Sequence, residues 1–469
     1  MDEHEISSYN ELTLEKAKEL VKILIDKKGF PESEAVLFQK LLWAFVELGE
    51  ASDSFKKGEK WEIVIEELID TIFYILDFIN LVEKTQGVKF DLNQQFYTKW
   101  KKNMERPLHY GLRRDINYSE GLEKRQLKKL TIELTNKCYN ECKHCSAFKE
   151  GKDLDRFMEY DQIINILDDL QFLEGEEIDL SGGEPLLHPR FYDIATYAKK
   201  KGFIVNVFTC GILSKKFDKK ILKMHADKIK KIGFNEVQIT LHAPNATMHD
   251  EITRSPGTFD KTIAFIKMLK NNGENIGVHF VPMAINAEEL EELVDYLIFL
   301  KLTRLNILRF FPQGRGKINE ADLALQPEAT AHMIKNVIEL CKKPEIKIIL
   351  GHPGDFRFIV DESHEPKKCS AGKSQCMIQI DGEVIPCPAF GELPDWVAGN
   401  VFKKSLIEIW RNSEVFLKLR EFEFQRLKGE CQTCQFLEKC QGRCPAERIR
   451  KNHDIYQGPD PDCPKPVLI

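Results

Sequence analysis

The feature that most constrains the fold is an alternation of short β-rich runs with amphipathic helical patterns, from about residue 128 to residue 311. The β-rich runs are "KLTIEL", "EIDLSGG", "IVNVFTCG", "EVQITLHA", "IGVHFVPM" and "RLNILRFF". Repeated βα units predict a parallel sheet, and six of them predict a full or partial barrel. Functional sites in such folds lie at the C-terminal ends of the strands.

The flanking regions differ from this central part, so we expect a multidomain α/β protein. Apolar residues recur at helical spacing before residue 112, where "KKGEK" would join two helices as a hairpin. The charged stretch that follows reads as a linker, and the last hundred residues are rich in cysteine with a weak apolar pattern, so they would need metal to fold. The predicted parts are an all-α module (1–112), a linker (113–127), a partial (βα)6 barrel (128–315), a bridging segment (316–365) and a small irregular iron-sulfur domain (366–469).

The thirteen cysteines are unevenly placed, with three between positions 138 and 145 and eight between positions 369 and 463. The acidic N-terminus shows no secretory signal, and no long uncharged apolar run predicts a membrane span. We therefore expect a cytoplasmic protein with reduced thiols, in which clustered cysteines bind metal. The net charge of −6 does not suggest general binding to nucleic acids or membranes. The isolated Cys210 and Cys341 are expected to be small buried hydrophobic residues.

The stretch "CYNECKHC" follows the first predicted strand directly, and it allows two kinds of site. A zinc site needs four ligands, and His144 is the local candidate for the fourth, although it adjoins Cys145. Alternatively, Cys138, Cys142 and Cys145 hold three corners of an iron-sulfur cubane and leave the fourth iron open. Farther along, "SGGEP" follows the second strand and Thr240 ends a later one, so both reach the same mouth.

These features together resemble the radical SAM enzymes, over roughly residues 128–315. The cysteine spacing matches that family's CxxxCxxC loop, and "SGGEP" matches its GGE motif. The resemblance implies that the three cysteines hold a 4Fe-4S cluster whose open iron binds S-adenosylmethionine, with His144 as a packing or stacking neighbour. It implies five residues in contact with that cofactor: Gly182, Gly183, Glu184, Thr240 and Arg254.

The C-terminal cysteines resemble the SPASM domain, which carries two auxiliary 4Fe-4S clusters and brings the expected total to three. The resemblance implies a first ligand set of Cys369, Cys376, Cys387 and Cys444. It implies a second set of Cys431, Cys434, Cys440 and Cys463. A pair of zinc sites is the alternative. Two fully ligated clusters would suit electron transfer and favour net oxidation of a substrate.

One relative within this family can be tested against the residue that follows the third cysteine of the domain. Anaerobic sulfatase-maturating enzymes carry a catalytic aspartate there, whereas this chain has Pro388. The departure argues against sulfatase maturation, and the sequence assigns no catalytic acid or base.

The N-terminal helices carry two pairs of carboxylates at i, i+3 spacing, which places each pair on one helix face. Such an oxygen-rich arrangement suits Mg²⁺, and the candidate ligands are Glu47, Glu50, Glu67 and Asp70. The pattern resembles MazG-like nucleotide pyrophosphohydrolases, and so does the trailing "KWKKNMERPLHYG". That resemblance implies that Lys102, Asn103 and Arg106 lie near nucleotide phosphates. It also implies either that a second copy of the module completes the site by dimerisation or that the module has become a scaffold.

The leading hypothesis is therefore a radical SAM/SPASM enzyme fused to a MazG-like module. It would cleave S-adenosylmethionine reductively and abstract hydrogen from a peptide or small-molecule substrate. The expected partners are a flavodoxin-type or ferredoxin-type reductant, a nucleoside triphosphate and a second copy of the chain. Two alternatives remain open: a nucleotide pyrophosphohydrolase with a regulatory iron-sulfur part, and radical modification of a nucleotide.

Overall fold

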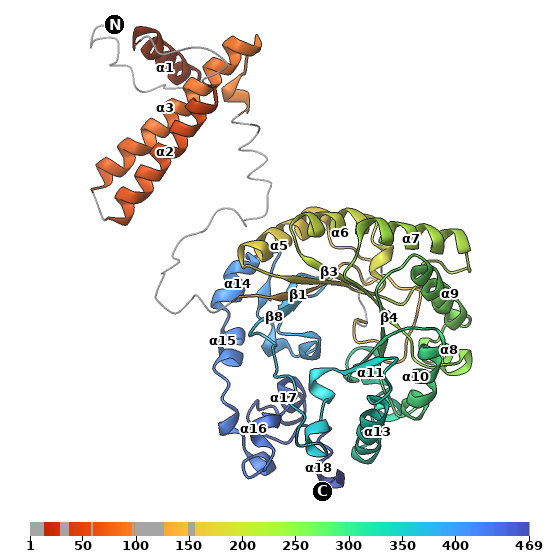
Figure 1. Cartoon of the computed structure of the whole chain (residues 1–469). Coiled ribbons are helices and arrows are strands. Elements are labelled where there is room, and N and C mark those ends of the chain that lie inside the picture. The colour runs from red at the N-terminus through yellow and green to blue at the C-terminus, as the bar shows by residue number, and fades with distance from the viewer. Residues whose placement is uncertain are drawn as a thin grey trace. The chain divides into compact units, whose positions relative to one another are not determined.

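The computed structural model describes residues 14–28, 37–57, 60–95, 98, 126–148 and 155–468. The chain divides into two compact units, Met1–Pro107 and Leu108–Ile469 (Figure 1). Among the described residues, no helix combines the length and the apolar composition needed to cross a membrane.

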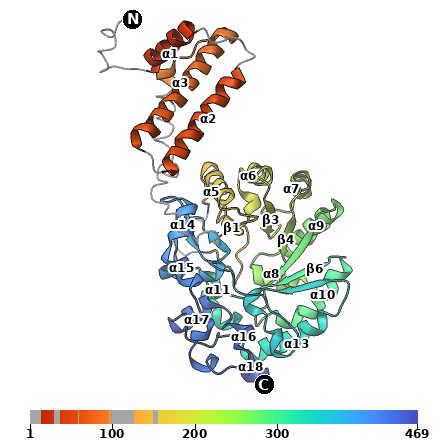
Figure 2. The same cartoon turned by 60° about the vertical axis from the view of Figure 1, so that its left-hand side comes forward.

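The N-terminal unit is built from helices in its described part: α1 (Leu14–Lys28), α2 (Leu37–Lys56) and α3 (Trp61–Gln86). Helices α2 and α3 lie side by side and run in opposite directions (Figures 1 and 2). A buried ion pair between Lys40 and Asp77, with 2.5 Å between Nζ and Oδ2, joins them. Helix α3 ends at Gly87, whose positive φ of 65° closes the last turn in the left-handed conformation that glycine favours.

The second unit is organised around one ten-stranded sheet with the order β10-β9-β8-β1-β2-β3-β4-β5-β6-β7. The strands are β1 (Lys129–Glu133), β2 (Glu177–Ser181), β3 (Ile204–Thr209), β4 (Glu236–Thr240), β5 (Ile276–Phe280), β6 (Arg304–Ile307), β7 (Lys347–Leu350), β8 (Gln375–Ile378), β9 (Glu383–Ile385) and β10 (Gly399–Asn400). Strands β1 to β8 pair in parallel, whereas β9 and β10 add an antiparallel edge. The six predicted strands are β1 to β6, and the predicted parallel sheet is confirmed.

Helices cover the outer face of this curved sheet (Figures 1 and 2). They are α5 (Tyr160–Phe172), α6 (Phe191–Lys200), α7 (Lys219–Ile232), α8 (Ala246–Thr253), α9 (Thr258–Asn271), α10 (Leu290–Phe299) and α13 (Pro327–Leu340). Apolar side chains of the central strands, such as Leu130, Ile178 and Val237, are fully buried and form one continuous core with these helices. Strands that are covered by helices need apolar residues in succession, which explains the valine- and isoleucine-rich runs.

The sheet continues beyond the six predicted βα units on both sides. Strand β7 comes from the predicted bridging segment and pairs with β6, while β8 comes from the cysteine-rich region and pairs with β1. The remaining helices are short: α11 (Arg315–Ile318), α12 (Glu320–Leu323), α14 (Leu406–Asn412), α15 (Glu414–Arg420), α16 (Leu437–Cys440), α17 (Pro445–Asn452) and α18 (Lys465–Leu468). The C-terminal region is therefore joined to the barrel by strand pairing, and it is less irregular than expected.

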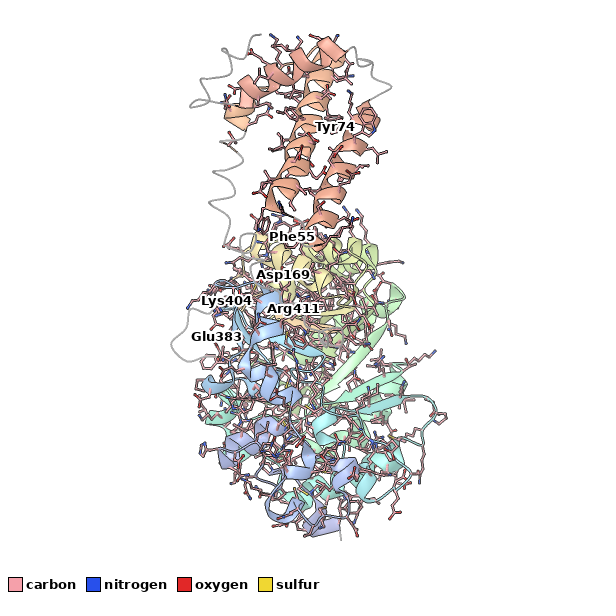
Figure 3. The ribbon with its side chains drawn as sticks, turned by 90° about the vertical axis from the view of Figure 1, so that its left-hand side faces the viewer. Phe55, Tyr74, Asp169, Glu383, Lys404 and Arg411 are labelled. Atoms are coloured by element: carbon pink, nitrogen blue, oxygen red, sulfur yellow. The ribbon has the colours of Figure 1, made fainter. Side chains whose placement is uncertain are left out.

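A side-chain contact reinforces this junction on the outside of the sheet. The Asp169 carboxylate on α5 accepts a hydrogen bond of 2.8 Å from the backbone N–H of Leu406 at the start of α14. Figure 3 shows Asp169 close to Lys404 and Arg411, which flank and belong to α14. The helix that opens the C-terminal part is thus fixed against the first helix of the barrel.

Candidate active site

The loop that carries Cys138, Cys142 and Cys145 leaves β1 at the C-terminal edge of the sheet. Backbone hydrogen bonds tie it to the end of α8: Glu141 N–H donates to Thr253 O over 3.1 Å, and Lys143 N–H donates to Ile252 O over 2.9 Å. On its other side the Arg315 guanidinium donates to Cys142 O over 2.9 Å. The loop is therefore held from two directions, which fixes the three thiols at the mouth of the sheet.

The three thiols are free and half-buried. Burial raises the pKa of Cys142 and of Cys145, and the positive charge of Arg315 partly offsets this effect. The pKa of Cys138 is lowered instead, because a hydrogen bond with the Cys210 thiol outweighs burial. A nearby arginine is a favourable environment for thiolates that bind a metal.

The two glycines of "SGGEP" follow β2 and lie directly against the cysteine loop. A Cβ at Gly182, whose φ is +141°, would lie 2.3 Å from Thr135 O, and one at Gly183 would lie 2.5 Å from Lys137 O. The backbone N–H of Gly183 donates to Thr135 O over 2.6 Å. Only glycine permits this approach, so the motif locks the second strand's loop onto the first.

Glu184 lies at the bottom of the same mouth and is fully buried. Its carboxylate accepts hydrogen bonds from Thr209 Oγ1 at 2.8 Å, from Cys210 N at 2.8 Å and from Cys210 Sγ at 3.0 Å. Burial raises the pKa of Glu184, and these hydrogen bonds offset part of the rise. A buried carboxylate held by neutral donors is suited to receive an ammonium group.

Thr240 and Arg254 are the other two residues that the resemblance implies in contact with the cofactor. Thr240 is the last residue of β4 and is half-buried at the mouth. Arg254 is exposed, and its guanidinium donates to Asn319 Oδ1 over 3.1 Å. Since the Asn319 amide donates in turn to Lys143 O over 3.0 Å, Arg254 lies at the rim beside the cysteine loop.

His144 packs edge-to-face on His242, with 4.5 Å between the ring centroids, which agrees with its expected role as a packing neighbour. Burial, followed by the charge of Arg315, lowers the pKa of His144 to about 4. Ligand atoms of Cys142, His144 and His242 lie within 4.8 Å of one another. The predicted zinc alternative would therefore draw on His242 as well as on His144.

The C-terminal cysteines form one group of four and one group of three. Burial raises the pKa of Cys431 to about 11, and the neighbouring thiols of Cys440 and Cys434 add to the rise. Burial likewise raises the pKa of Cys463 to about 12, to which Cys440 and Cys431 contribute, so these four thiols lie near one another. Cys369, Cys387 and Cys444 pack in a common cluster. The pKa of Cys387 is raised by burial and then by Cys369, and that of Cys444 is raised by burial and also by Cys387.

Cys376 does not join the predicted first set, which corrects that assignment. It lies in β8, and its side chain is buried in the core of the barrel with Ile378. Met377, between them, faces the cluster that contains the other three cysteines. Neighbouring residues of a strand point to opposite faces, so strand geometry turns the Cys376 thiol away. The structure therefore brings together three of the four thiols of the predicted first set, and the fourth lies in the core of the barrel.

Comparison with models of protein families matches residues 132–299 to the radical SAM superfamily. It matches residues 369–435 to SPASM, an iron-sulfur cluster-binding domain. The chain has a radical SAM domain followed by a SPASM domain. Domains of these two kinds bind 4Fe-4S clusters and S-adenosylmethionine, and the thiols, the close-packed glycines and the buried Glu184 fit such a cofactor set.

Several characterised proteins are similar to this chain over most of its length. The AdoMet-dependent heme synthase of Methanosarcina barkeri is 27% identical over 347 residues, which cover 71% of this chain and 94% of that protein. The mycofactocin maturase MftC of Mycolicibacterium smegmatis is 28% identical over 342 residues, covering 71% of this chain and 82% of that protein. The crystal structure of Streptococcus suis SuiB bound to precursor peptide SuiA has a TM-score of 0.59 at 18% identity, covering 80% of this chain and 89% of that one. The last similarity concerns the fold.

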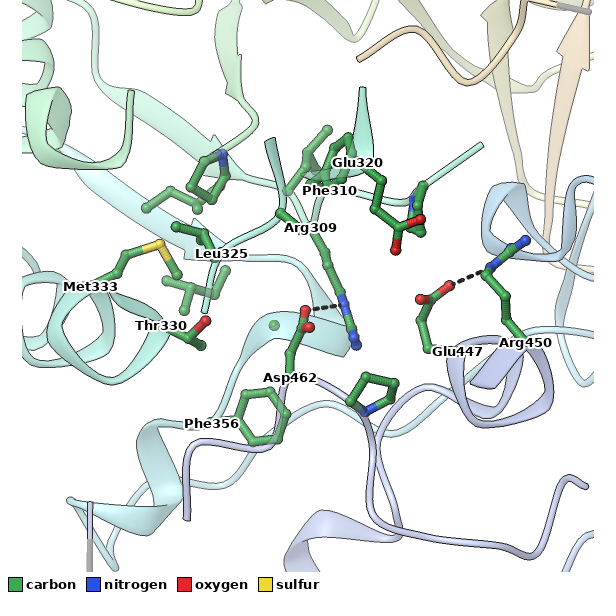
Figure 4. Close-up of a pocket in the computed structure, with 18 of the residues that line it drawn as sticks. Arg309, Phe310, Glu320, Leu325, Thr330, Met333, Phe356, Glu447, Arg450 and Asp462 are labelled. Atoms are coloured by element: carbon green, nitrogen blue, oxygen red, sulfur yellow. Dashed lines mark hydrogen bonds and ion pairs between the residues drawn. The ribbon is translucent and has the colours of Figure 1, made fainter. Parts of the chain in front are cut away.

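A cavity of about 400 Å³ lies where the radical SAM domain meets the end of the chain (Figure 4). One part of its wall is apolar and includes Leu325, Met333 and Phe356. The other part is charged, and Figure 4 shows Glu447 paired with Arg450 and Arg309 paired with Asp462. The cavity can hold a substrate group with both apolar and polar surface.

Arg309 lies two residues after the end of β6 and forms a buried ion pair that joins the barrel to the C-terminal region. Its guanidinium makes two hydrogen bonds to the Asp460 carboxylate, of 2.9 and 2.7 Å, and pairs with Asp462 at 2.7 Å. Burial alone would raise the pKa of Asp460, but Arg309 holds it below its usual range. Asp460 also accepts from the backbone N–H of Cys444 over 2.9 Å, so Arg309 acts on a predicted cluster ligand through one intermediate.

The N-terminal carboxylates come together in the first unit. Carboxylate oxygens of Glu47, Glu50 and Glu67 lie within 4.8 Å of one another. The pKa of Glu47 is raised by partial burial and then by the charges of Glu50, Asp70 and Glu67. The MazG-like resemblance stays a prediction, and Lys102, Asn103 and Arg106 lie outside the described residues.

The sequence analysis did not predict the roles or surroundings of several residues of the site. Cys210, expected to be a small buried hydrophobic residue, makes polar contacts instead, and its thiol donates to Glu184 Oε2 over 3.0 Å. Cys341, expected to be buried, is exposed. Arg309 and Glu447 were not among the predicted site residues, although the sequence holds a signal for each: Arg309 lies near the end of the β-rich run "RLNILRFF", and Glu447 follows Cys444 by three residues.

Proposed function

We propose that this chain is a radical SAM/SPASM enzyme that abstracts hydrogen from a peptide or small-molecule substrate, with net oxidation of that substrate. The observation that carries the proposal is the contact between the cysteine loop and "SGGEP". The backbone of Gly183 is hydrogen-bonded to the segment that leads into the loop, and Glu184 lies fully buried beside Cys210 and Cys138. A barrel that only sensed redox state would not need a buried carboxylate at this place.

The chain's own residues have distinct roles in this reaction. Cys138, Cys142 and Cys145 would hold the cluster, which supplies the electron that cleaves S-adenosylmethionine into methionine and a 5′-deoxyadenosyl radical. Glu184 would accept hydrogen bonds from the methionyl amine, and Thr240 and Arg254 would bind at the rim. A flavodoxin-type or ferredoxin-type protein would deliver the electron.

The SPASM region would receive the electron that the substrate loses. Cys431, Cys434, Cys440 and Cys463 provide four thiols for one auxiliary cluster, and Cys369, Cys387 and Cys444 provide three for the other, giving three clusters in the chain. The site of the first set would lie close to the cavity wall, because Cys444 directly precedes helix α17, which carries Glu447 and Arg450.

The proposed substrate class rests on the named relatives and on one residue that differs from the sulfatase-maturating enzymes. MftC is named a maturase, SuiB was crystallised with a precursor peptide, and the heme synthase points to small molecules. Pro388 stands where sulfatase-maturating enzymes carry their base, so we do not propose that reaction.

The decisive experiment incubates reduced, cluster-loaded protein with S-adenosylmethionine and measures 5′-deoxyadenosine. We expect slow formation without substrate and none from a variant with Cys138, Cys142 and Cys145 all changed to alanine. Cys341→Ala serves as the matched control, because this exposed cysteine lies outside every proposed ligand set. Absence of 5′-deoxyadenosine from the wild type, with its clusters intact, would refute the proposal.

A second activity is proposed for the N-terminal unit: Mg²⁺-dependent hydrolysis of a nucleoside triphosphate to the monophosphate and pyrophosphate. It is favoured by the close approach of Glu47, Glu50 and Glu67, to which Asp70 adds negative charge. Carboxylate oxygens at this spacing suit Mg²⁺. Large apolar side chains such as Phe45 and Trp61 are more than 60% exposed, at 64% and 66%, which favours a homodimer through these helices.

The test measures pyrophosphate release and Mg²⁺ binding by the full chain. Glu67→Ala should abolish both, whereas Glu66→Ala, on the adjacent exposed position, should leave both unchanged. Hydrolysis that survives Glu67→Ala would contradict the assignment. Sedimentation of the full chain would show whether it is a dimer.

A further inference from the structure

A fully buried arginine, Arg448, lies beside both groups of C-terminal cysteines. It belongs to α17, one turn after Cys444, and its backbone N–H donates to Cys444 O over 3.3 Å. The residue is 0% exposed. A buried charge is costly unless it is paired and hydrogen-bonded, so the groups around this guanidinium must compensate its charge.

Two backbone carbonyls hold the guanidinium of Arg448, and both lie near cysteines of the second set. Nη1 donates to the carbonyl of Gly442, which lies two residues after Cys440. Nε donates to Ile455 O over 3.1 Å. The chain after Ile455 runs beside the segment that leads to Cys431, because the N–H of Lys428 donates to Tyr456 O over 2.8 Å. These two hydrogen bonds fix the plane of the guanidinium next to the second set.

Two glycines allow the close packing around this guanidinium. A Cβ at Gly442, whose φ is +72°, would lie 2.5 Å from Arg448 Nη1. A Cβ at Gly458 would lie 2.4 Å from Cys431 Sγ. Only glycine leaves room at both positions, so the guanidinium packs directly against the backbone of the loop between Cys440 and Cys444.

The remaining nitrogen of the guanidinium lacks an acceptor. Nη2 of Arg448 is buried and has no hydrogen-bond partner among the residues that the structure describes. Burial lowers the pKa of Arg448, and the groups that oppose this effect are Asp460, Cys444, Cys431 and Cys440. Both carboxylate oxygens of Asp460 already accept hydrogen bonds from Arg309. The other three groups are thiols proposed as cluster ligands, and an orphaned buried donor among them fits a bound cluster whose sulfur atoms would accept its hydrogen bond.

We propose that Arg448 donates a hydrogen bond through Nη2 to the auxiliary cluster held by the second set, and that it thereby raises the reduction potential of that cluster. This inference rests on the proposed function, in which the second set holds a cluster and the SPASM region receives the electron that the substrate loses. A cluster gains one negative charge when it is reduced. A fixed positive charge that is hydrogen-bonded to its sulfur therefore stabilises the reduced form more than the oxidised form. Arg448 is thus a positioning residue that favours transfer of the substrate's electron to the second set.

The size of the effect follows from the strength of a hydrogen bond to a charged group. Such a bond shifts an equilibrium by about tenfold to a hundredfold. For a one-electron couple, a factor of ten corresponds to about 59 mV. Removal of the guanidinium should therefore lower the midpoint potential of this cluster by about 59 mV or more.

The experiment measures the midpoint potentials of the clusters in the full chain by redox titration with electron paramagnetic resonance. A variant with Cys431 and Cys434 both changed to alanine identifies the signal of the second set. Arg448→Gln should lower the potential of the second set alone. Arg448→Lys keeps a positive charge and a donor, so its potential should lie closer to that of the wild type.

Arg426→Gln is the matched control, because it removes an arginine from the same region that is exposed to solvent. The Arg426 guanidinium lies over the Tyr456 ring, with 4.6 Å from Cζ to the ring centroid. Solvent screens this charge, so every potential should match that of the wild type.

A second measurement does not depend on the folding of an Arg448 variant. Wild-type chain that carries isotope-labelled arginine Nη atoms should show, in pulsed electron paramagnetic resonance, a nitrogen coupled to the reduced cluster of the second set. Arg443→Gln should keep this coupling, because the Arg443 side chain donates to the backbone carbonyls of Cys440, Asp355 and Lys439.

Three results would overturn the proposal: an unchanged potential of the second set in Arg448→Gln, a shift of another cluster instead, or no coupled Nη atom in the wild type. If Arg448→Gln fails to retain the cluster, the labelled wild type decides. A wild type with no more iron than the variant that lacks Cys431 and Cys434 would instead refute the proposed function of the second set.

Discussion

The ion pair at Arg309 offers the sharpest test of how the barrel and the SPASM region are held together. The perturbation is Arg309→Gln, which removes the charge and leaves Asp460 and Asp462 facing each other. The exposed fractions of the paired side chains are 5% for Arg309, 1% for Asp460 and 35% for Asp462, so only Asp462 can turn to solvent. Removal of one partner from a buried pair costs about 3–5 kcal/mol.

We take the lower end, about 3 kcal/mol, because Asp462 is partly solvated. At 1.4 kcal/mol per factor of ten, this corresponds to local opening that is about a hundredfold more frequent. The backbone N–H groups of Cys444 and Asp462, which donate to Asp460 over 2.9 and 3.0 Å, report that opening directly. Amide hydrogen exchange of the full chain, followed by mass spectrometry, should show peptides with these residues exchanging about a hundredfold faster.

The other end of the same strand provides the control. Arg304 begins β6 and pairs with Glu236 at 3.1 Å, but its side chain is 38% exposed. Arg304→Gln should change stability by only about 0.2–1 kcal/mol and leave the exchange near Cys444 unaltered. Exchange near Cys444 that is identical in wild type and Arg309→Gln would refute the reasoning. The difference in stability between wild type and Arg309→Gln should also become smaller in acid, because the pKa of Asp460 is lowered in the folded protein. The ionised Asp460 stabilises the fold fully at a pH above its pKa in the unfolded chain, and this stabilisation is lost as the pH falls through its pKa in the folded protein.

Three further predictions concern the close-packed glycine, the odd cysteine and a buried histidine. Gly182→Ala should weaken S-adenosylmethionine binding about tenfold or more, because it disrupts the hydrogen bonds that hold "SGGEP". Gly202→Ala is the control: Gly202 also has a positive φ but has open space around it, so this variant should bind the cofactor like the wild type. Equilibrium binding measures both variants. Cys376→Ala should retain the iron content of the wild type, whereas Cys369→Ala should lose one cluster; equal loss would restore Cys376 as a ligand. Burial, and then the charge of Lys228, lowers the pKa of His225 to about 4. The stability of the protein should therefore fall as the pH drops from about 6.5 toward 4. The unfolding temperature of His225→Gln should decrease less over this pH range than that of the wild type.

The six parallel strands and the three-cysteine loop were predictable because both are local properties of the sequence. Each β-rich run is followed by its own helix, and a parallel sheet then places every loop after a strand at one edge. The cysteine loop after β1 and the glycines after β2 were therefore expected to meet, and Gly183 and Glu184 do bond to that loop. The conclusion needed no knowledge of distant pairings.

The extension of the sheet could not be predicted in the same way. Strand β8 pairs with β1 across more than two hundred residues, with Leu130 opposite Cys376. Nothing in "QCMIQI" indicates its partner, because pairing between distant strands depends on which edge the folded barrel leaves open. The Arg309 pair with Asp460 depends on the same long-range arrangement, since 151 residues separate its members.

The two errors about cysteines have a common cause, since each followed from treating a cysteine by its spacing instead of its strand. Cys376 fits the spacing of a ligand, but it alternates with Met377 in β8, and Met377 takes the face toward Cys369 and Cys387. Cys210 fits no spacing and was assigned to the core, but it is the first residue after β3, at the edge where the cysteine loop and Glu184 already lie. Strand register therefore removes one thiol from a predicted cluster and adds another to the active site, which makes position relative to a strand end the better guide to metal ligands in this fold.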